Sequence, residues 1–208
     1  MSTILKEIRK PFLVTLVLLL ICGLIYPLLL TGISQVLFPK QANGSLIMVD
    51  GQTIGSELVG QDFSDARFMK SRPSAVNYNT YTQEDKDNGN YTGVGSGSKN
   101  YAPTNPDLVK RVEADIAEFL KVNPSIKKED IPTDLLTASG SGLDPHISPA
   151  SAAVQIPALV ETTGLSKEQL DTIVKNNTQD KFLGIIGEKT VNVLKVNLEI
   201  AKELGLLK

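Results

Sequence analysis

FLVTLVLLLICGLIYPLLLTGISQVLF, residues 12–38, is the stretch around which the rest of the chain is organised. It holds no charged residue, and the nearest charged residues on either side are Lys10 and Lys40. A helix crosses a hydrocarbon core about 30 Å thick with roughly 20 apolar residues. At about 1.5 Å per residue this stretch is about 40 Å long, which is enough to cross with some tilt. We therefore predict a single N-terminal transmembrane helix over residues 12–38.

The charges around this helix predict its orientation. The basic residues before it are Lys6, Arg9 and Lys10. Only Glu7 offsets them, and Lys40 alone follows closely on the far side. Positively charged flanks stay in the cytoplasm. We therefore expect a cytoplasmic N-terminus over residues 1–11 and an extracytoplasmic domain over residues 39–208, on the outer face of a bacterial plasma membrane.

A cleaved signal peptide is the alternative interpretation of the same stretch. Its apolar core would be about 7 to 15 residues long and would end in small residues of the A-x-A type. Here the apolar run continues well beyond that length and ends in QVLFPK. The sequence therefore favours an uncleaved anchor.

Small and polar residues recur every four positions along the predicted span. They are Gly23, Pro27, Thr31 and Gln35. At that spacing they share one helix face, which allows a second helix to approach closely and to exchange hydrogen bonds. One interpretation is a stripe that docks on a membrane partner. The other is a tolerated proline kink followed by polar residues close to the interface, and the sequence alone leaves both open.

Composition limits what the outer domain can do. About 165 to 170 residues follow the span, enough for one domain with its own core. The whole chain has a formal net charge of −2 and the N-terminal segment is basic, so the outer domain is near −4. This charge argues against nucleic acid as a partner. The single cysteine lies in the span and the chain has one histidine, which argues against disulfides and a structural zinc site.

The outer domain is predicted to mix strands and helices. Residues 46–59 form a β-hairpin around Asp50-Gly51, whereas residues 60–104 are poor in apolar residues and irregular. The helices are one capped by Asn105, one over 148–163 that Pro157 kinks or splits, and one opened by the capping box Ser166–Gln169. Residues 191–204 are either a short strand followed by a helix or helical throughout. We predict an α+β fold: a transmembrane helix, then one mixed extracytoplasmic domain with a β-hairpin and three to four helices.

The loop TASGSGLDPHISPASA, residues 137–152, is the most distinctive part of the outer domain. Its Ser139, Ser141, Asp144 and His146 are the residue types of a serine hydrolase, in which a base activates the nucleophile and a carboxylate orients the base. The G-x-S-x-G nucleophile elbow is absent, however. The favoured interpretation is that these residues shape a tight turn. A membrane-anchored extracytoplasmic hydrolase or nucleotide-binding domain is kept as the alternative.

With one predicted span, the chain cannot enclose a pore by itself. It also has no T-V-G-Y-G filter sequence and no D-K-T-G-like phosphorylation sequence of an ion-pumping ATPase. A role in transport would therefore be that of an accessory subunit.

Several ordered motifs together give the chain a specific resemblance. They are GSELVGQDFSDARF at 55–68, SRPSA at 71–75, NYAPTNPDL at 100–108, the 137–152 loop, LGIIGE at 183–188 and VNVLKVNLEIA at 191–201. With the single N-terminal span, they cover nearly the whole chain. The chain resembles the KdpC family, the C subunits of the bacterial high-affinity potassium-transporting Kdp ATPase.

The resemblance implies a non-catalytic subunit of a P-type ATPase complex. The implied partners are a channel-like subunit that conducts potassium, a catalytic subunit that hydrolyses ATP, and a very small single-span subunit. The C subunit is expected on the outer side, against the channel-like subunit, where it supports assembly and ion affinity. It requires no cofactor of its own, because the complex uses the ATP.

A nucleotide-binding role is also associated with the family, through a glutamine that corresponds to Gln155. The family usually has an arginine after the Gln-x-Pro pattern, whereas this chain has Ala158, with the acidic Glu161 close by. This departure weakens an anion-binding role for the segment. For the outer-face contact, the expected residues are Ser139, Ser141, Asp144 and His146.

Overall fold

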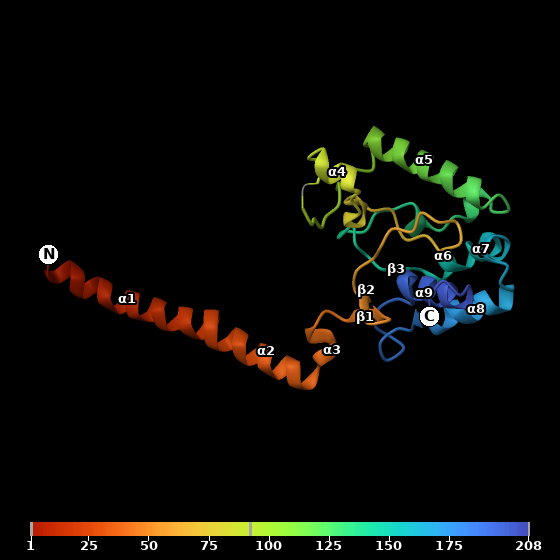
Figure 1. Ribbon diagram of the computed structural model, residues 1–208. Coiled ribbons are helices and arrows are strands. Elements are labelled where there is room, and N and C mark those ends of the chain that lie inside the picture. Colours follow the sequence, from red (N-terminus) through yellow and green to blue (C-terminus); the bar gives the residue numbers. More distant parts are fainter. Residues whose placement is uncertain (1, 92, 208) are drawn as a thin grey trace. The chain divides into compact units, whose positions relative to one another are not determined.

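The computed structural model describes residues 2–91 and 93–207. The chain divides into a unit of residues 1–46 and a unit of residues 47–208, and each is described by itself (Figure 1). The prediction of a mixed α+β chain with one N-terminal apolar helix is confirmed. Membrane crossing itself stays a prediction.

The N-terminal unit is a long helix. It consists of α1 (Ser2–Leu20), a π-helical turn (Ile21–Ile25) and α2 (Tyr26–Leu37), and the short α3 (Pro39–Ala42) follows. Residues Glu7–Leu37 are long and apolar enough to cross a membrane, and their large apolar side chains are exposed. The helix begins before the apolar stretch 12–38, since Lys6–Lys10 belong to the same helix α1.

Pro27 explains the π-helical turn. A proline has no N–H to donate to the carbonyl four residues earlier, and its ring clashes with that carbonyl. The carbonyl belongs to Gly23, which lies within the wider turn Ile21–Ile25. Tyr26 donates instead to the carbonyl of Ile21, five residues back. The widened turn therefore lets the helix continue through the proline.

The C-terminal unit opens with the predicted hairpin. Strands β1 (Leu46–Val49) and β2 (Gln52–Ser56) pair with each other. The two turn residues, Asp50 and Gly51, have φ of +49° and +77°, as a two-residue hairpin turn requires. The hairpin prediction is confirmed.

The following stretch is irregular, as expected. Its regular elements are a 3-10 turn (Asn77–Asn79) and the short helix α4 (Gln83–Asp87). Helix α5 (Pro106–Val122) then begins at the predicted cap, where the Asn105 side chain accepts a hydrogen bond from the Asp107 N–H at 2.8 Å. Two 3-10 turns, Lys128–Asp130 and Thr133–Leu135, lead to the 137–152 loop.

Three very short strands form a second, antiparallel sheet. They are β3 (His146–Ile147), β4 (Thr178–Gln179) and β5 (Thr190–Asn192), in the order β3-β5-β4. His146 pairs with Asn192, and Thr178 pairs with Val191. The sequence indicated a short strand near β5, but it did not predict β3, β4 or their pairing with β5, because strands of two residues show no periodicity.

The helices of the second half follow the predicted signals. They are α6 (Pro149–Ala153), α7 (Ile156–Thr163), α8 (Lys167–Asn176) and α9 (Val193–Glu203). Pro157 splits α6 from α7, and Gly164 ends α7 in the left-handed conformation at φ +74°. The Ser166–Gln169 capping box opens α8. In the described part of this unit, four helices have eight or more residues: α5, α7, α8 and α9.

One hydrophobic core lies among these helices and the second sheet. Its members are Met69, Ile147, Ala152, Ile156, Leu159, Leu170, Ile173, Val191, Val193, Val196 and Ile200. Met69 comes from the irregular region and is fully buried. Its backbone is held by Asn197 of α9, whose amide oxygen accepts from the Met69 N–H at 2.8 Å and whose amide nitrogen donates to the Met69 carbonyl at 2.9 Å. A segment outside the described helices and strands is thereby fixed in the core.

Candidate functional site

The 137–152 loop is fastened by backbone hydrogen bonds to two distant segments. The Gly60 N–H donates to the Leu143 carbonyl at 2.8 Å, and the Gly97 N–H donates to the Ser141 carbonyl at 2.7 Å. The Ser74 hydroxyl donates to the Gly142 carbonyl at 2.6 Å. These bonds join three parts of the irregular sequence into one ordered surface, which we call the loop cluster (residues 60–78, 93–97 and 137–148).

Two glycines allow this close approach. A Cβ on Gly60 would lie 2.6 Å from the Asp144 carbonyl oxygen, and a Cβ on Gly142 would lie 2.7 Å from the Gly97 carbonyl oxygen. Gly142 also has φ of +66°, which disfavours other residues. By contrast, Gly140 has no atom within 4 Å of its Cβ position. The glycines of the loop therefore have different roles, and Gly140 marks its open tip.

Asp144 is the electrostatic centre of the loop cluster. The Arg72 guanidinium donates to its carboxylate at 3.0 Å and to the Thr137 carbonyl at 3.3 Å. Burial raises the pKa of Asp144, but hydrogen bonds from His146 and the charge of Arg72 outweigh it, so the pKa lies below its ordinary value. The sequence suggested Asp144 but not Arg72, because 72 residues separate them.

The predicted residues of the loop do not assemble a hydrolase triad. Ser139 is buried and its hydroxyl accepts from the Gly142 N–H at 2.9 Å, while the Ser141 hydroxyl accepts from the Leu143 N–H at 3.1 Å. His146 lies 3.5 Å from Asp144, and no hydrogen bond joins it to either serine among the described residues. The hydroxyls are used to shape the turn, so the outward-facing part of the loop is Gly140 and Ser141.

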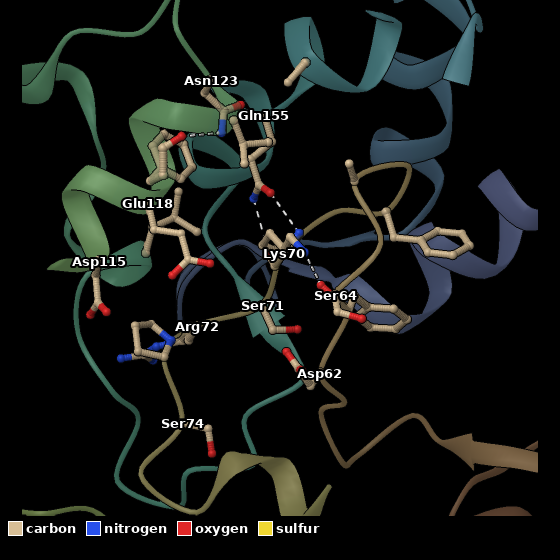
Figure 2. A pocket seen from close by; sticks show the side chains of 18 of the residues that line it. Asp62, Ser64, Lys70, Ser71, Arg72, Ser74, Asp115, Glu118, Asn123 and Gln155 are labelled. Carbon is tan, nitrogen blue, oxygen red and sulfur yellow. Dashed lines mark hydrogen bonds between the residues drawn. The ribbon is translucent and has the colours of Figure 1, made fainter. Parts of the chain in front are cut away.

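A pocket with a volume of about 360 Å³ lies beside the loop cluster. Figure 2 shows Gln155 directed at Lys70, with Glu118 and Asp115 on one side and Arg72 below them. The charged side chains that line it are Asp62, Lys70, Arg72, Asp115 and Glu118. Burial raises the pKa of Asp115, and Glu118 raises it further against the effect of Arg111. The pocket is therefore more acidic than basic.

Gln155 has a structural position in this pocket. It is buried, its amide oxygen accepts from the Lys70 N–H at 2.8 Å, and its amide nitrogen donates to the Ser151 carbonyl at 3.0 Å and the Lys70 carbonyl at 3.3 Å. The Lys70 side chain donates to the Phe63 carbonyl. Ala158 also lines the pocket and adds no charge to its wall.

Two further residues of the site, besides Arg72, were not expected from the sequence. The amide oxygen of Asn123 is buried in the pocket wall and has no partner among the described residues. The Tyr78 hydroxyl donates to the Arg72 carbonyl at 2.7 Å, and burial raises the pKa of Tyr78 to about 12. No motif marks either residue, because each has its role only through the fold.

The predicted stripe of the N-terminal helix is exposed. Gly23, Pro27, Thr31 and Gln35 all face away from other described parts of their unit. Gln35 has a partner at the helix end, because its side chain exchanges two hydrogen bonds with Asn43 at 3.1 and 3.3 Å. Gln35 therefore has a local role in the turn after α2, whereas Gly23 and Thr31 are free for a neighbouring helix.

Among the described residues, no group of three or more His, Cys, Asp or Glu side chains could hold a metal ion. The described residues of the site thus form an ordered loop cluster beside an acidic pocket.

Comparisons with known proteins agree over nearly the whole chain. Residues 8–202 match the family model described as "KdpC: K+-transporting ATPase, c chain". A potassium-transporting ATPase KdpC subunit of Clostridium kluyveri is 80% identical over 206 residues, which cover 99% of this chain and 98% of the relative. KdpC subunits of Clostridioides difficile and Caldanaerobacter subterraneus are 60% and 45% identical, over 97% and 96% of this chain and 100% and 96% of theirs. The chain belongs to the KdpC family, the C subunits of potassium-transporting ATPases.

Proposed function

We propose that the chain is a non-catalytic subunit of an ATP-driven, high-affinity potassium import complex. It supports assembly and ion affinity by contacting the channel-like subunit on the outer face of the membrane. The observation that carries this proposal is the loop cluster, in which hydrogen bonds from Gly60, Ser74 and Gly97 fix the 137–152 loop in one conformation. A surface that is already ordered loses little entropy when it binds.

Its partners in this proposal are the channel-like subunit, the catalytic P-type ATPase subunit and a small single-span subunit. The anchor holds the outer domain at the membrane, and the stripe of Gly23 and Thr31 accepts a neighbouring helix. The mildly acidic outer domain raises the local concentration of cations, although charge alone does not favour potassium over sodium. The effect on ion affinity is therefore mainly mechanical, because the chain holds the channel-like subunit in one arrangement.

We infer that nucleotide is bound elsewhere in the complex. In the pocket beside Gln155, three carboxylates face two cations. Arg72 is already paired with Asp144, and the Lys70 side chain is already bonded to a carbonyl. Such a pocket repels a polyphosphate, and Ala158 provides no compensating charge. The chain thus requires no cofactor of its own.

A substitution at Gly140, the exposed tip of the 137–152 loop, tests the proposed contact. Gly140→Arg adds a large side chain where none of the chain's own atoms is near, so we expect the isolated chain to keep its unfolding temperature. We expect co-purification of the channel-like subunit with a C-terminally tagged chain to fall about tenfold, equivalent to about 1.4 kcal/mol. Half-saturation of the potassium-stimulated ATPase should shift to higher potassium.

Asn176→Arg is the matched control, because Asn176 is exposed on α8. It should leave both measurements unchanged. Normal co-purification and normal potassium affinity of Gly140→Arg would remove the loop from the proposed contact.

A further inference from the structure

Most side-chain donors of the acidic pocket beside the loop cluster are engaged within the chain itself. The Lys70 side chain donates to a backbone carbonyl, and the Arg72 guanidinium donates to a carboxylate and to a carbonyl. The hydroxyls of Ser71, Ser74 and Tyr78 each donate to a backbone carbonyl as well. An anionic ligand needs donors, and it therefore finds few of them free in this pocket.

The unpaired charges of the pocket are negative. Its carboxylates are Asp62, Asp115 and Glu118. Asp115 is paired with Arg111, whereas Asp62 and Glu118 have no ion pair among the residues that the structure describes. Figure 2 shows the Glu118 side chain reaching from α5 toward the middle of the pocket. Two unpaired carboxylates that line one pocket attract positive charge to it.

Apolar side chains form much of the remaining wall. Val122 lies one turn after Glu118 on the same face of α5. Phe119, Leu135 and Leu159 also line the pocket, and the two leucines are buried. A bare calcium ion takes about six to eight oxygen ligands, and no group of three or more acidic, His or Cys side chains in the described part of the chain could hold a metal ion. Carboxylates beside an apolar wall suit an organic cation instead.

One buried acceptor in the wall of the pocket lacks a donor. Asn123 caps the end of α5 and is 5% exposed. Its amide nitrogen donates to the Phe119 carbonyl at 3.0 Å, which fixes the orientation of the amide, and its Oδ1 has no partner among the described residues. Figure 2 shows Asn123 and Gln155 at one end of the pocket and Ser74 at the other. Buried polar atoms are normally hydrogen-bonded, so an N–H group of a ligand at this end would complete the site.

We propose that this pocket binds a short aliphatic diamine in its doubly charged form. The two positive charges match the two unpaired carboxylates, Asp62 and Glu118. Each ammonium group carries three N–H donors, one of which bonds to Asn123, and the methylene chain packs against Phe119 and Val122. The volume of about 360 Å³ is within the range of small-molecule sites. The site needs no other subunit, so it is independent of the contact proposed above.

Calorimetric titration of the full chain in phosphatidylcholine nanodiscs tests the proposal. Putrescine is the probe, and empty nanodiscs provide the blank. Its hexamethylated analogue keeps both charges and the methylene chain but has no N–H group, and calcium chloride supplies two charges without a chain. We expect saturable binding of putrescine with a dissociation constant below about 1 mM. The hexamethylated analogue and calcium should each bind at least tenfold more weakly.

A substitution on α5 assigns the binding to this pocket. Glu118→Gln removes one unpaired carboxylate and keeps the size of the side chain, so the affinity for putrescine should fall at least tenfold. Glu113→Gln is the matched control, because Glu113 is exposed on the same helix and does not line the pocket. It makes the same change in net charge and should bind putrescine as the wild type does.

Adding a cation to the pocket provides a second measurement. Ala158→Arg places a guanidinium among the carboxylates, where it competes with the diamine, and putrescine affinity should fall at least tenfold. Ala153→Arg is the control, because Ala153 is exposed on α6 and lies outside the pocket lining. It should leave the affinity unchanged.

Four results would overturn the proposal. The absence of saturable putrescine binding would mean that the pocket takes no diamine. Equal affinity for the hexamethylated analogue would mean that the N–H groups are not recognised. Equal affinity for calcium would mean that the chain attracts divalent charge in general. Equal losses in Glu118→Gln and Glu113→Gln would mean that net charge, and not this pocket, holds the diamine.

Discussion

At the scale of single residues, side-chain amides replace the hydrogen bonds that a neighbouring strand would provide. Asn197 exchanges two hydrogen bonds with the backbone of Met69, and Gln155 exchanges two with the backbone of Lys70. Buried backbone groups that lose their partner are costly. These two amides therefore fix Met69, the member of the irregular region that is fully buried in the core, and its neighbour Lys70.

Replacing Asn197 should show the strength of this arrangement. Asn197→Leu leaves the Met69 N–H and carbonyl buried without a partner, so the free energy of unfolding should fall by about 2–4 kcal/mol. Denaturant unfolding of the full chain in detergent, followed by circular dichroism, measures this change. Asn176→Leu, at an exposed position of α8, is the control and should change the free energy by less than about 0.5 kcal/mol. Similar values for the two variants would contradict the assigned role.

Asp144 makes the stability of the loop cluster depend on pH. Its folded-state pKa lies below the ordinary value of 3.8, so its contribution is fully present above that value and is lost as the pH falls through the folded-state pKa. At pH 7, Asp144→Asn should lower the free energy of unfolding by about 1–2 kcal/mol, since a charged hydrogen bond to Arg72 is lost. The difference from wild type should shrink below pH 4 and vanish at lower pH. A difference that is constant from pH 7 to pH 2 would contradict this account.

At the scale of elements, α5 is the least embedded of the four helices of eight or more residues described in the C-terminal unit. None of its described residues is fully buried, whereas α9 buries six. Pockets lie against both of its halves: Leu108 and Arg111 line one, and Phe119 and Val122 line the other. Helix α5 is therefore held by partial contacts along one face, and it should open more easily than the rest of its unit.

Hydrogen exchange should separate α5 from α9. An element that is held by few buried contacts opens more often, and each opening exposes its amides to exchange. We expect the central amides of α5 to exchange at least tenfold faster than those of α9 at the same pH and temperature. Mass spectrometry of peptic peptides from the full chain measures both helices in one experiment. Equal protection would mean that the pockets do not weaken the packing of α5.

The elements also show which parts of the fold a single sequence can predict. Helices with strong end signals were predicted closely, because Asn105, Ser166 and Gly164 act on backbone groups within a few residues of themselves. The short helix α4 was not predicted, although Thr82 and Asp85 form a capping box, since too few residues follow to show an apolar stripe. The second sheet depends on pairing between His146 and Asn192, and that distance in sequence leaves no local pattern.

The candidate site was likewise predictable only in part from the sequence. The 137–152 loop was identifiable from its residue types, and the structure places it at the centre of the loop cluster. Its inner and outer faces were not predictable: Ser139 is buried, and Ser141 uses its hydroxyl within the turn. The pairing of Arg72 with Asp144 and the unpartnered amide oxygen of Asn123 both arise from long-range packing. The order and the exposure of the loop residues depend on this packing, which only the structure provides.

At the scale of the whole molecule, the chain combines a long apolar helix with a separate folded unit. The basic residues before the helix favour a cytoplasmic N-terminus. Protease added to intact spheroplasts should therefore cleave residues 39–208 and remove a C-terminal tag, while a tag at the N-terminus survives. Immunoblotting for the two tags measures the result. Full protection of the C-terminal tag, with cleavage after lysis as the control, would reverse the orientation.

The hydrogen bonds between Met69 and Asn197 join residues 128 positions apart. During synthesis, the backbone of Met69 has no native partner until residue 197 has left the ribosome. The core of the C-terminal unit therefore closes only after α9 has emerged. A product that stops before α9 keeps an open, apolar interior, and such incomplete products are ready substrates for cellular proteases.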